Sequence, residues 1–247
     1  MLNRSLPGIL AAVLALALWA GAAGHWPQAH LPTPLAVLAA LEKAAASGEL
    51  WRHLAATLGR VVVSFVLAMS LGTAVGCLLG RSPLINRLFG GWLLVLLNLP
   101  ALVVIILAYI WFGLTEAAAV FAVALNKLPH VAVTVREGSR ALDPALEEMA
   151  IVFQWSRWRR LRHILLPHLV PYLFAAARSG LALIWKIVLV VEMLGRSNGI
   201  GFQIHLLFQV FDVAGILAYS LAFIAVIQAV EWGVLRRWEA RCVRWRG

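Results

Sequence analysis

The sequence is poor in charge and in cysteine, and it lacks the motifs of nucleotide hydrolysis. Only 13% of its 247 residues are charged and only two are cysteines, Cys77 and Cys242. Two distant cysteines build neither a disulfide framework nor a metal cluster. The sequence has no glycine-rich Lys-Ser/Thr loop and no His/Glu spacing suited to a catalytic metal. These absences argue against an ATPase or a metalloenzyme, and we expect no catalytic residue, metal or cofactor in this chain.

What the sequence has instead is apolar length. Hydrophobic residues make up 62% of it, too much for a soluble globule. A helix needs about 20 apolar residues to cross the hydrocarbon core, and six segments meet that need. They are Gly8 to Gly24, Leu58 to Gly80, Leu88 to Phe112, Ala117 to Val135, Leu169 to Leu194 and Val213 to Leu235. The sequence predicts an all-α polytopic membrane protein with about six transmembrane helices.

The first segment has two interpretations. Arg4, the apolar run from Ile9 to Trp19 and the small residues Ala20-Gly21-Ala22 suit a retained membrane anchor or a cleavable signal peptide. We favour the anchor. Both interpretations place the residues after Gly24 outside, so the orientation of the other spans does not depend on the choice.

The distribution of cations predicts the orientation. With the N-terminus inside, fourteen of the twenty-one Lys and Arg residues fall on the cytoplasmic side, as the positive-inside rule requires. They include Arg4, Arg81, Arg87, Arg136, Arg140, the cluster Arg157 to Arg162, and five arginines from Arg236 to Arg246. Both termini are therefore expected in the cytoplasm. The net charge of +10 is explained by topology and anionic lipid, and no nucleic-acid partner is expected.

Ionisable residues inside the predicted spans are candidates for a polar path, since each is costly in hydrocarbon. Arg178, Trp185 and Glu192 are spaced by seven and fall within about 40° of one another on a helix. They either line a pathway or subunit interface, or Arg178 and Glu192 reach opposite membrane surfaces. Lys127 and Lys186 lie deeper. Lys127 either binds substrate or satisfies a carbonyl that Pro129 frees.

The longest polar interruption begins with a strong helix start. Asp143 suits the N-cap, Pro144 the first helical position, and Glu147 and Glu148 the positive end of the helix dipole. A short helix is therefore expected there, followed by an interfacial segment rich in Trp and Arg and by Pro167 at the entry to the fifth span. A capped helix at the membrane surface predicts a soluble partner.

Residues in this interruption resemble a known family. Glu148-Met149-Ala150, then Gln154, then Ile164-Leu165-Leu166-Pro167 keep the spacing of the Glu-Ala-Ala, Gly, Ile-x-Leu-Pro signature of bacterial ABC-importer permease subunits, and the chain resembles the nitrate/sulfonate/taurine type. Met149 replaces an Ala of that signature, and Gln154 replaces its Gly. Further similarity covers His53 to Arg60, Trp111 to Glu116 as an outer turn, and Asn198 to Gly201 as a glycine-rich outer loop.

The resemblance implies the type I importer permease architecture and a set of partners. These are an ABC ATPase that binds ATP and magnesium, a periplasmic or lipoprotein solute-binding protein, and a second, commonly identical permease chain in the bacterial inner membrane. The helix from about Pro144 to Phe153 would be the coupling helix. The ATPase-coupling residues would be Asp143, Glu147, Glu148, Ala150, Gln154, Ile164 and Pro167.

The domain division implied is 1–56, an N-terminal anchor helix and outer segment, and 57–247, a permease core with a coupling loop at 136–167. The expected substrate is a small anion of the nitrate, sulfonate or taurine kind, because of Lys127, Arg178 and Lys186. Two alternatives stay open. A proton-coupled secondary transporter would use Glu192 and His130 as a relay, and an intramembrane enzyme would need a buried nucleophile such as Ser70 or Ser179.

Overall fold

The structure of the chain is a computed structural model that describes residues 6–27 and 30–235, and every regular element in these residues is helical. The helices in the first half are α1 (Leu6–Ala23), α2 (Pro34–Ala46), α3 (Glu49–Arg81), α4 (Pro83–Asn98), α5 (Ala101–Phe112) and α6 (Glu116–Arg140). The second half contains α7 (Pro144–Val152), α8 (Arg157–Arg160), the π-turn η2 (Leu161–Leu165), α9 (Leu166–Gly195), α10 (Ile200–Gln209), α11 (Val213–Val230) and the π-turn η3 (Glu231–Leu235). The predicted orientation depends partly on Arg4 and on the arginines from Arg236 onward, which lie outside the described residues. Cys242 lies outside them as well.

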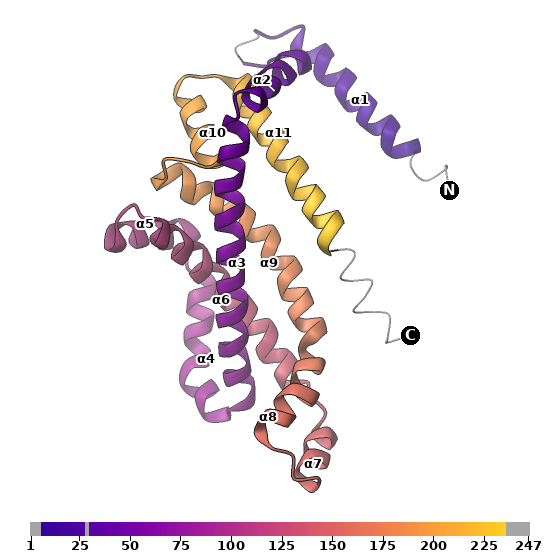
Figure 1. Cartoon of the computed structure of the whole chain (residues 1–247), viewed down its shortest axis with the longest axis vertical. Helices are drawn as coiled ribbons and strands as arrows, with labels where there is room; N and C mark the ends of the chain where they lie inside the picture. Colours follow the sequence, from indigo (N-terminus) through magenta and orange to yellow (C-terminus); the bar gives the residue numbers. More distant parts are fainter. Residues whose placement is uncertain (1–5, 28–29, 236–247) are drawn as a thin grey trace. The chain divides into compact units, whose positions relative to one another are not determined.

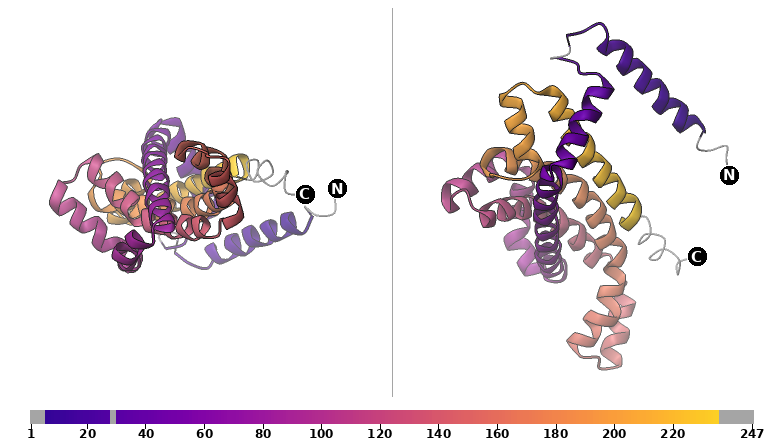
Figure 2. Two further views of the ribbon diagram at one scale, coloured as in Figure 1. Left: turned by 90° about the horizontal axis from the view of Figure 1, so that it is seen from below. Right: turned by 45° about the horizontal axis from the view of Figure 1, so that its top comes forward.

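The helices fall into two compact units, which Figures 1 and 2 show from three directions. Unit 1 comprises Met1–Thr57 and Ser197–Ala229, and unit 2 comprises Leu58–Arg196 and Val230–Gly247. Helix α3 therefore begins in one unit and ends in the other. The polar segment from 136 to 167 and the candidate pathway residues all belong to unit 2.

Unit 2 is built around α6, which packs against α3 along a stripe of three glycines. Gly72, Gly76 and Gly80 recur every fourth residue, so they lie on one face of α3. A Cβ atom added to Gly76 would lie 2.6 Å from the carbonyl oxygen of Ala132, and one added to Gly80 would lie 2.5 Å from Cβ of Ser139. The two backbones thus approach as closely as small residues permit, which is a common way to pack helices in lipid.

Helix α6 also packs on α9. Val131 and Val135 of α6 and Leu169 and Ala176 of α9 are fully buried in one apolar cluster. Ala150 of α7 belongs to the same cluster. The burial of this cluster therefore fixes α7 to the long helices as well as joining those helices to each other.

The segment from Leu88 to Phe112, predicted as one spanning helix, is not a continuous helix. The segment forms two helices, α4 and α5, bent by 98° at a short break. Proline explains the break, because Pro100 has no N–H to donate and disfavours the helical conformation of the residue before it. Leu99 accordingly adopts an extended conformation with φ −68° and ψ 126°. Figure 1 shows α5 running across the direction of α4.

Four helices in the described residues are long and apolar enough to cross a membrane: Glu49–Arg81, Glu116–Arg140, Arg157–Gly195 and Val213–Gly233. The bent pair α4 and α5 brings the number to five if it is one span, and α1 is a shorter apolar helix. The all-α polytopic class is confirmed, whereas the number of six spans stays a prediction.

The fifth span starts earlier than its apolar run. Helices α8 and α9 form one helical path of 39 residues, Arg157–Gly195, with η2 between them. In the π-turn the N–H of Leu166 donates to the carbonyl of Leu161, five residues back. This wider turn lies directly before Pro167, whose ring would clash with the preceding turn of a regular α-helix. Pro167 is at the second position of α9 and lies within the helical path.

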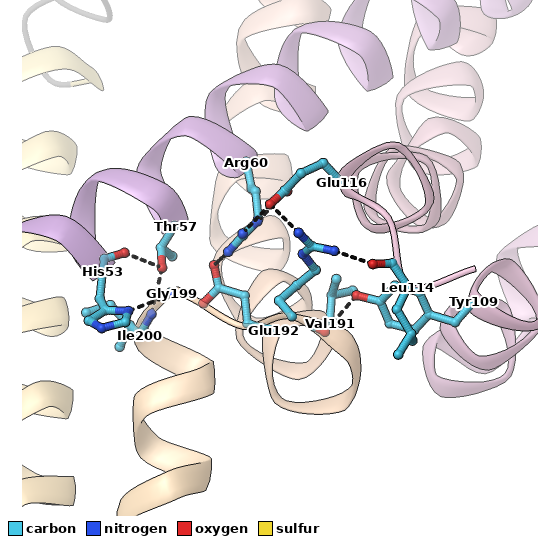
Figure 3. A network of polar contacts seen from close by, with 11 residues as sticks. His53, Thr57, Arg60, Tyr109, Leu114, Glu116, Val191, Glu192, Gly199 and Ile200 are labelled. Carbon is cyan, nitrogen blue, oxygen red and sulfur yellow. Dashed lines mark hydrogen bonds and ion pairs between the residues drawn. The ribbon is translucent and has the colours of Figure 1, made fainter. Parts of the chain in front are cut away.

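Unit 1 holds α10 against the first turns of α3 through backbone N–H groups. The N–H of Gly199 donates to Nδ1 of His53 over 3.0 Å, and that of Ile200 donates to Oγ1 of Thr57 over 2.8 Å (Figure 3). Gly199 has φ 114°, a conformation that glycine adopts readily and other residues rarely do. The loop expected from Asn198 to Gly201 is therefore shorter, because α10 begins at Ile200.

Candidate functional site

The helix predicted in the polar interruption is confirmed as α7, Pro144–Val152, within one residue of its expected end. The carboxylate of Asp143 accepts a hydrogen bond from the N–H of Ala145 over 2.9 Å, and Pro144 occupies the first turn. Both residues act as expected from their local preferences. In Figure 1, α7 and α8 lie beyond the first turns of α9.

One face of α7 is anchored and the other is exposed. Ala150 is fully buried in a cluster with Ile164 and Leu165, so two residues of the family signature, Ala150 and Ile164, help to hold the segment in place. Glu148 is exposed. The exposed apolar side chains of the segment are Leu146, Met149, Ile151, Val152 and Phe153, of which Val152 is 77% exposed. A short helix with such a surface suits contact with another protein.

Gln154 ends the helix in a conformation that favours glycine. Its φ is +52°, in the left-handed region that residues with a Cβ atom enter at a cost. The N–H of Gln154 donates to the carbonyl of Ile151, and the N–H of Trp155 donates to that of Ala150, both over 2.9 Å. These two bonds form a Schellman motif. The chain thus keeps the turn that the signature glycine makes, although the residue there is glutamine.

Replacing Gln154 by Gly should stabilise the protein. We expect Gln154→Gly to raise the free energy of unfolding by about 1 kcal/mol, because the left-handed conformation is strained only for residues with a Cβ atom. Gln154→Val should lower it, since a β-branched residue fits this region worst. Thermal unfolding in detergent measures both changes, and a lower melting temperature for the glycine variant would show that the glutamine side chain compensates for its strain.

An ion pair attaches α7 to the end of α3. Arg81, the last residue of α3, binds Glu147 in the first turn of α7. Sequence reasoning assigned Arg81 only to membrane orientation and Glu147 to the ATPase. The structure gives both a further role, because the pair joins α7 to the spanning helix α3.

At the other end of unit 2 lies a network of two arginines and two glutamates (Figure 3). Arg60 of α3 donates from Nε and Nη2 to the carboxylate of Glu116 over 2.9 and 2.7 Å. Its Nη1 donates to Oε1 of Glu192 over 2.6 Å. Arg60 is 5% exposed and Glu192 is 0% exposed. Two buried charges of opposite sign in contact avoid the cost that either would have alone.

The network continues to the end of α9. Arg196 donates from Nη2 to the same carboxylate of Glu116 over 2.6 Å and from Nη1 to the carbonyl of Leu114. The hydroxyl of Tyr109 donates to the carbonyl of Val191 over 2.9 Å. These bonds connect α3, α5, α6 and α9 at one level. The four charges cancel, so the network is suited to holding these helix ends together.

The candidate pathway residues of α9 do not share one environment. Glu192 is paired with Arg60 as described, and Trp185 is 5% exposed. Arg178 and Lys186, by contrast, are exposed on the surface of unit 2. The ion pair of Glu192 also leaves the proton-coupled alternative without support, since the carboxylate proposed as a relay already binds an arginine.

Lys127 is the most deeply placed cation in the described residues. It lies near the middle of α6, is 2% exposed, and makes no hydrogen bond or ion pair with another residue of the described chain. Gly180 of α9 makes room for it, because a Cβ atom there would lie 2.6 Å from Cε of Lys127. The freed carbonyl next to Pro129 does not accept a bond from Lys127. The amide nitrogen of its neighbour Asn126 is likewise buried without a partner.

Sequence reasoning missed three residues of the charged network, namely Arg60, Glu116 and Arg196. All stand at the outer ends of predicted spans, which was the available signal. It also missed the glycine stripe of α3, although a Gly at every fourth position of an apolar helix is typical of close helix packing.

The fold and this site define a class of protein: a polytopic helical membrane protein with a short capped helix displayed between two spans. The comparison with solved structures agrees. An amino acid ABC transporter crystallised with histidines is similar in fold, with a TM-score of 0.65 at 19% identity, covering 81% of this chain and 97% of that one.

The chain belongs to the family described as "Binding-protein-dependent transport system inner membrane component", whose sequence profile matches residues 68–233. It is thus an inner-membrane permease of the ABC importer type. It is 34% identical over 189 residues to the Escherichia coli protein named "Putative aliphatic sulfonates transport permease protein SsuC", covering 76% of this chain and 72% of that one. It is 28% identical to the Bacillus subtilis protein of the same name, covering 97% and 87%. It is 27% identical to the E. coli "Taurine transport system permease protein TauC", covering 88% and 80%.

Proposed function

We propose that the chain is half of a homodimeric pathway that imports a small organic anion of the sulfonate type. A separate ATPase, which binds ATP and magnesium, drives transport while bound to α7 on the cytoplasmic side. A solute-binding protein delivers the substrate on the opposite side, and both termini of the chain lie in the cytoplasm. The observation that carries the proposal is the rigid display of α7, anchored by Ala150 and exposed at Glu148 and Phe153.

Local contacts hold both ends of α7 in place. The helix is capped at Asp143, closed by the Schellman turn at Gln154 and packed on the start of α9. A force applied to it therefore reaches α6 and α9 without being absorbed in a loose loop. Closure of an ATPase dimer would in this way tilt α6 and α9, which share one buried cluster.

The charges of unit 2 support an anionic substrate. Lys186 is exposed along a spanning helix, where a cation needs protein, water or a ligand beside it, and Arg178 adds a second positive charge to that helix. Glu192 does not oppose an anion, because its charge is offset by Arg60. The names of the related sulfonate and taurine permeases agree with this substrate class.

Reversing the charge of Glu148 should uncouple the importer. Because truncating one partner of a buried interfacial charge pair costs about 2–5 kcal/mol and bringing like charges together costs several kcal/mol, we expect Glu148→Lys to weaken ATPase binding about 30-fold or more. ATP-driven uptake of an alkanesulfonate into proteoliposomes with the ATPase and binding protein should be lost. Affinity capture of the ATPase from detergent measures the first effect.

The control variant for this test is Arg162→Glu, a reversal on an exposed residue of η2, outside α7. It should bind the ATPase almost normally. Normal capture of the ATPase and normal alkanesulfonate uptake with Glu148→Lys would refute binding of the ATPase to α7. Uptake driven by a proton gradient in proteoliposomes without the ATPase would refute the importer proposal as a whole.

A further inference from the structure

A pocket of about 430 Å³ lies in unit 2 between the last turn of α3, the start of α7 and the helical path from α8 into α9. Its volume falls within the range of about 300–1,000 Å³ found for small-ligand sites. Leu142, Ile164 and Leu165 are buried members of its wall, and Leu78 and Leu161 extend it. The greater part of the exposed wall is therefore apolar.

The charged residues of the pocket carry an excess of positive charge. Arg81, Arg157 and Arg160 line it together with the single carboxylate of Glu147. That carboxylate is bound by Arg81. Arg157 and Arg160 have no carboxylate partner in the described chain, and Arg160 uses only Nε, which donates to the carbonyl of Trp155 over 3.0 Å. Two guanidinium groups thus remain for an anion.

The position of the pocket adds a constraint. It is lined by the last turn of α3, where an apolar span ends at Arg81, so it lies at the boundary between hydrocarbon and headgroups. The cytoplasmic location of that boundary rests on the proposed function. Basic pockets between spanning helices at this level suit anionic lipid headgroups.

We propose that this pocket binds an anionic phospholipid, whose phosphate lies between Arg157 and Arg160 and whose first methylene groups lie along Leu78, Leu161 and Leu165. Guanidinium groups bind phosphate oxygens in a bidentate manner, which gives the site its selectivity for phosphate. A free phosphate ion would satisfy the arginines but would gain nothing from the apolar wall. Only an amphiphile meets both halves of the pocket.

The lipid would stabilise the contact between α3, α7 and α9. Arg81 and Glu147 on one side and Arg157 and Arg160 on the other belong to elements that line this pocket together. A bound headgroup neutralises the repulsion among the three arginines, and its chain excludes water from Leu142 and Ile164. The site therefore places the coupling segment under the influence of membrane composition.

The test uses the full chain in nanodiscs of phosphatidylcholine alone and of phosphatidylcholine with phosphatidylglycerol. The anionic lipid should raise the melting temperature by several degrees. Arg157→Gln should lose at least half of that rise, and Leu78→Phe, which fills the pocket without changing charge, should lose a similar share. Arg162→Gln, which removes one exposed charge outside the pocket, should keep it.

Three outcomes would overturn the proposal. An equal loss in Arg162→Gln would show general surface attraction, and a full rise in Leu78→Phe would show that the pocket is not entered. The same rise produced by inorganic phosphate in phosphatidylcholine nanodiscs would identify a free-anion site. Phospholipid that stays bound through detergent extraction, counted by native mass spectrometry, should also fall in Arg157→Gln. ATP-driven uptake remains a separate measurement, so the transport function can hold when the lipid site fails.

Discussion

Replacing Arg60 by Met should destabilise the protein by about 3–5 kcal/mol, the cost of leaving one member of a buried ion pair alone. Glu192 is 0% exposed and loses its 2.6 Å partner in this variant, so its charge would remain in a region without water. Glu116 would suffer less, because it is 54% exposed and keeps Arg196. The apparent melting temperature in detergent measures the loss.

A second substitution distinguishes the lost charge from lost packing. Adding Glu192→Gln to Arg60→Met removes the unpaired charge, and we expect the double variant to recover a large part of the stability. Arg60→Lys is the matched control, since it keeps the charge but not the forked contact with two carboxylates. A double variant as unstable as the sum of the two single variants would show that the pair does not interact.

Gly76→Leu should prevent α3 and α6 from packing. A Cβ atom at Gly76 would lie 2.6 Å from the carbonyl oxygen of Ala132 and 2.7 Å from Cβ of Val135. Neither backbone nor a buried valine can move far, and overpacking of a core costs about 1–3 kcal/mol even for smaller additions. We expect little folded protein in the membrane fraction, as measured by size-exclusion chromatography after extraction.

Gly59 offers a control on the same helix and in the same unit. No atom lies within 4 Å of a Cβ placed there, so Gly59→Leu should accumulate normally. Replacement by alanine should change the stability in opposite directions at the two positions. Gly59→Ala gains helix propensity of about 1 kcal/mol, whereas the added Cβ atom of Gly76→Ala clashes with α6. Equal yields of the two leucine variants would contradict the close approach of α3 and α6.

The parts that could be predicted from the sequence are those with local causes. Asp143 and Pro144 specify the start of α7 through contacts within one turn, and apolar length locates α3, α6, α9 and α11. The left-handed turn at Gln154 was indicated only by the resemblance, since glutamine itself does not favour that conformation.

The parts that escaped prediction depend on residues far apart in the chain. Arg60 meets Glu192 across 132 positions, and no local pattern reveals which of several ionisable residues will be partners. The break before Pro100 is different, because its signal was present. Apolar composition on both sides of Pro100 suggested one span, because composition gives no information about a change in the direction of the helix axis.

The break at Leu99 also determines which surface of the chain can meet lipid. A helix that stops leaves carbonyl and N–H groups without partners, and hydrocarbon offers them none. Asn98, Leu99 and Pro100 are exposed in the single chain. The carbonyl of Leu94 accepts the side-chain amide of Asn98 and that of Leu96 accepts the N–H of Leu99, which leaves other carbonyls at the end of α4 without a partner in the described chain. This corner must therefore be wetted or covered by protein. Lipid is restricted to the unbroken helical faces, and a lone chain has an incomplete membrane-facing boundary.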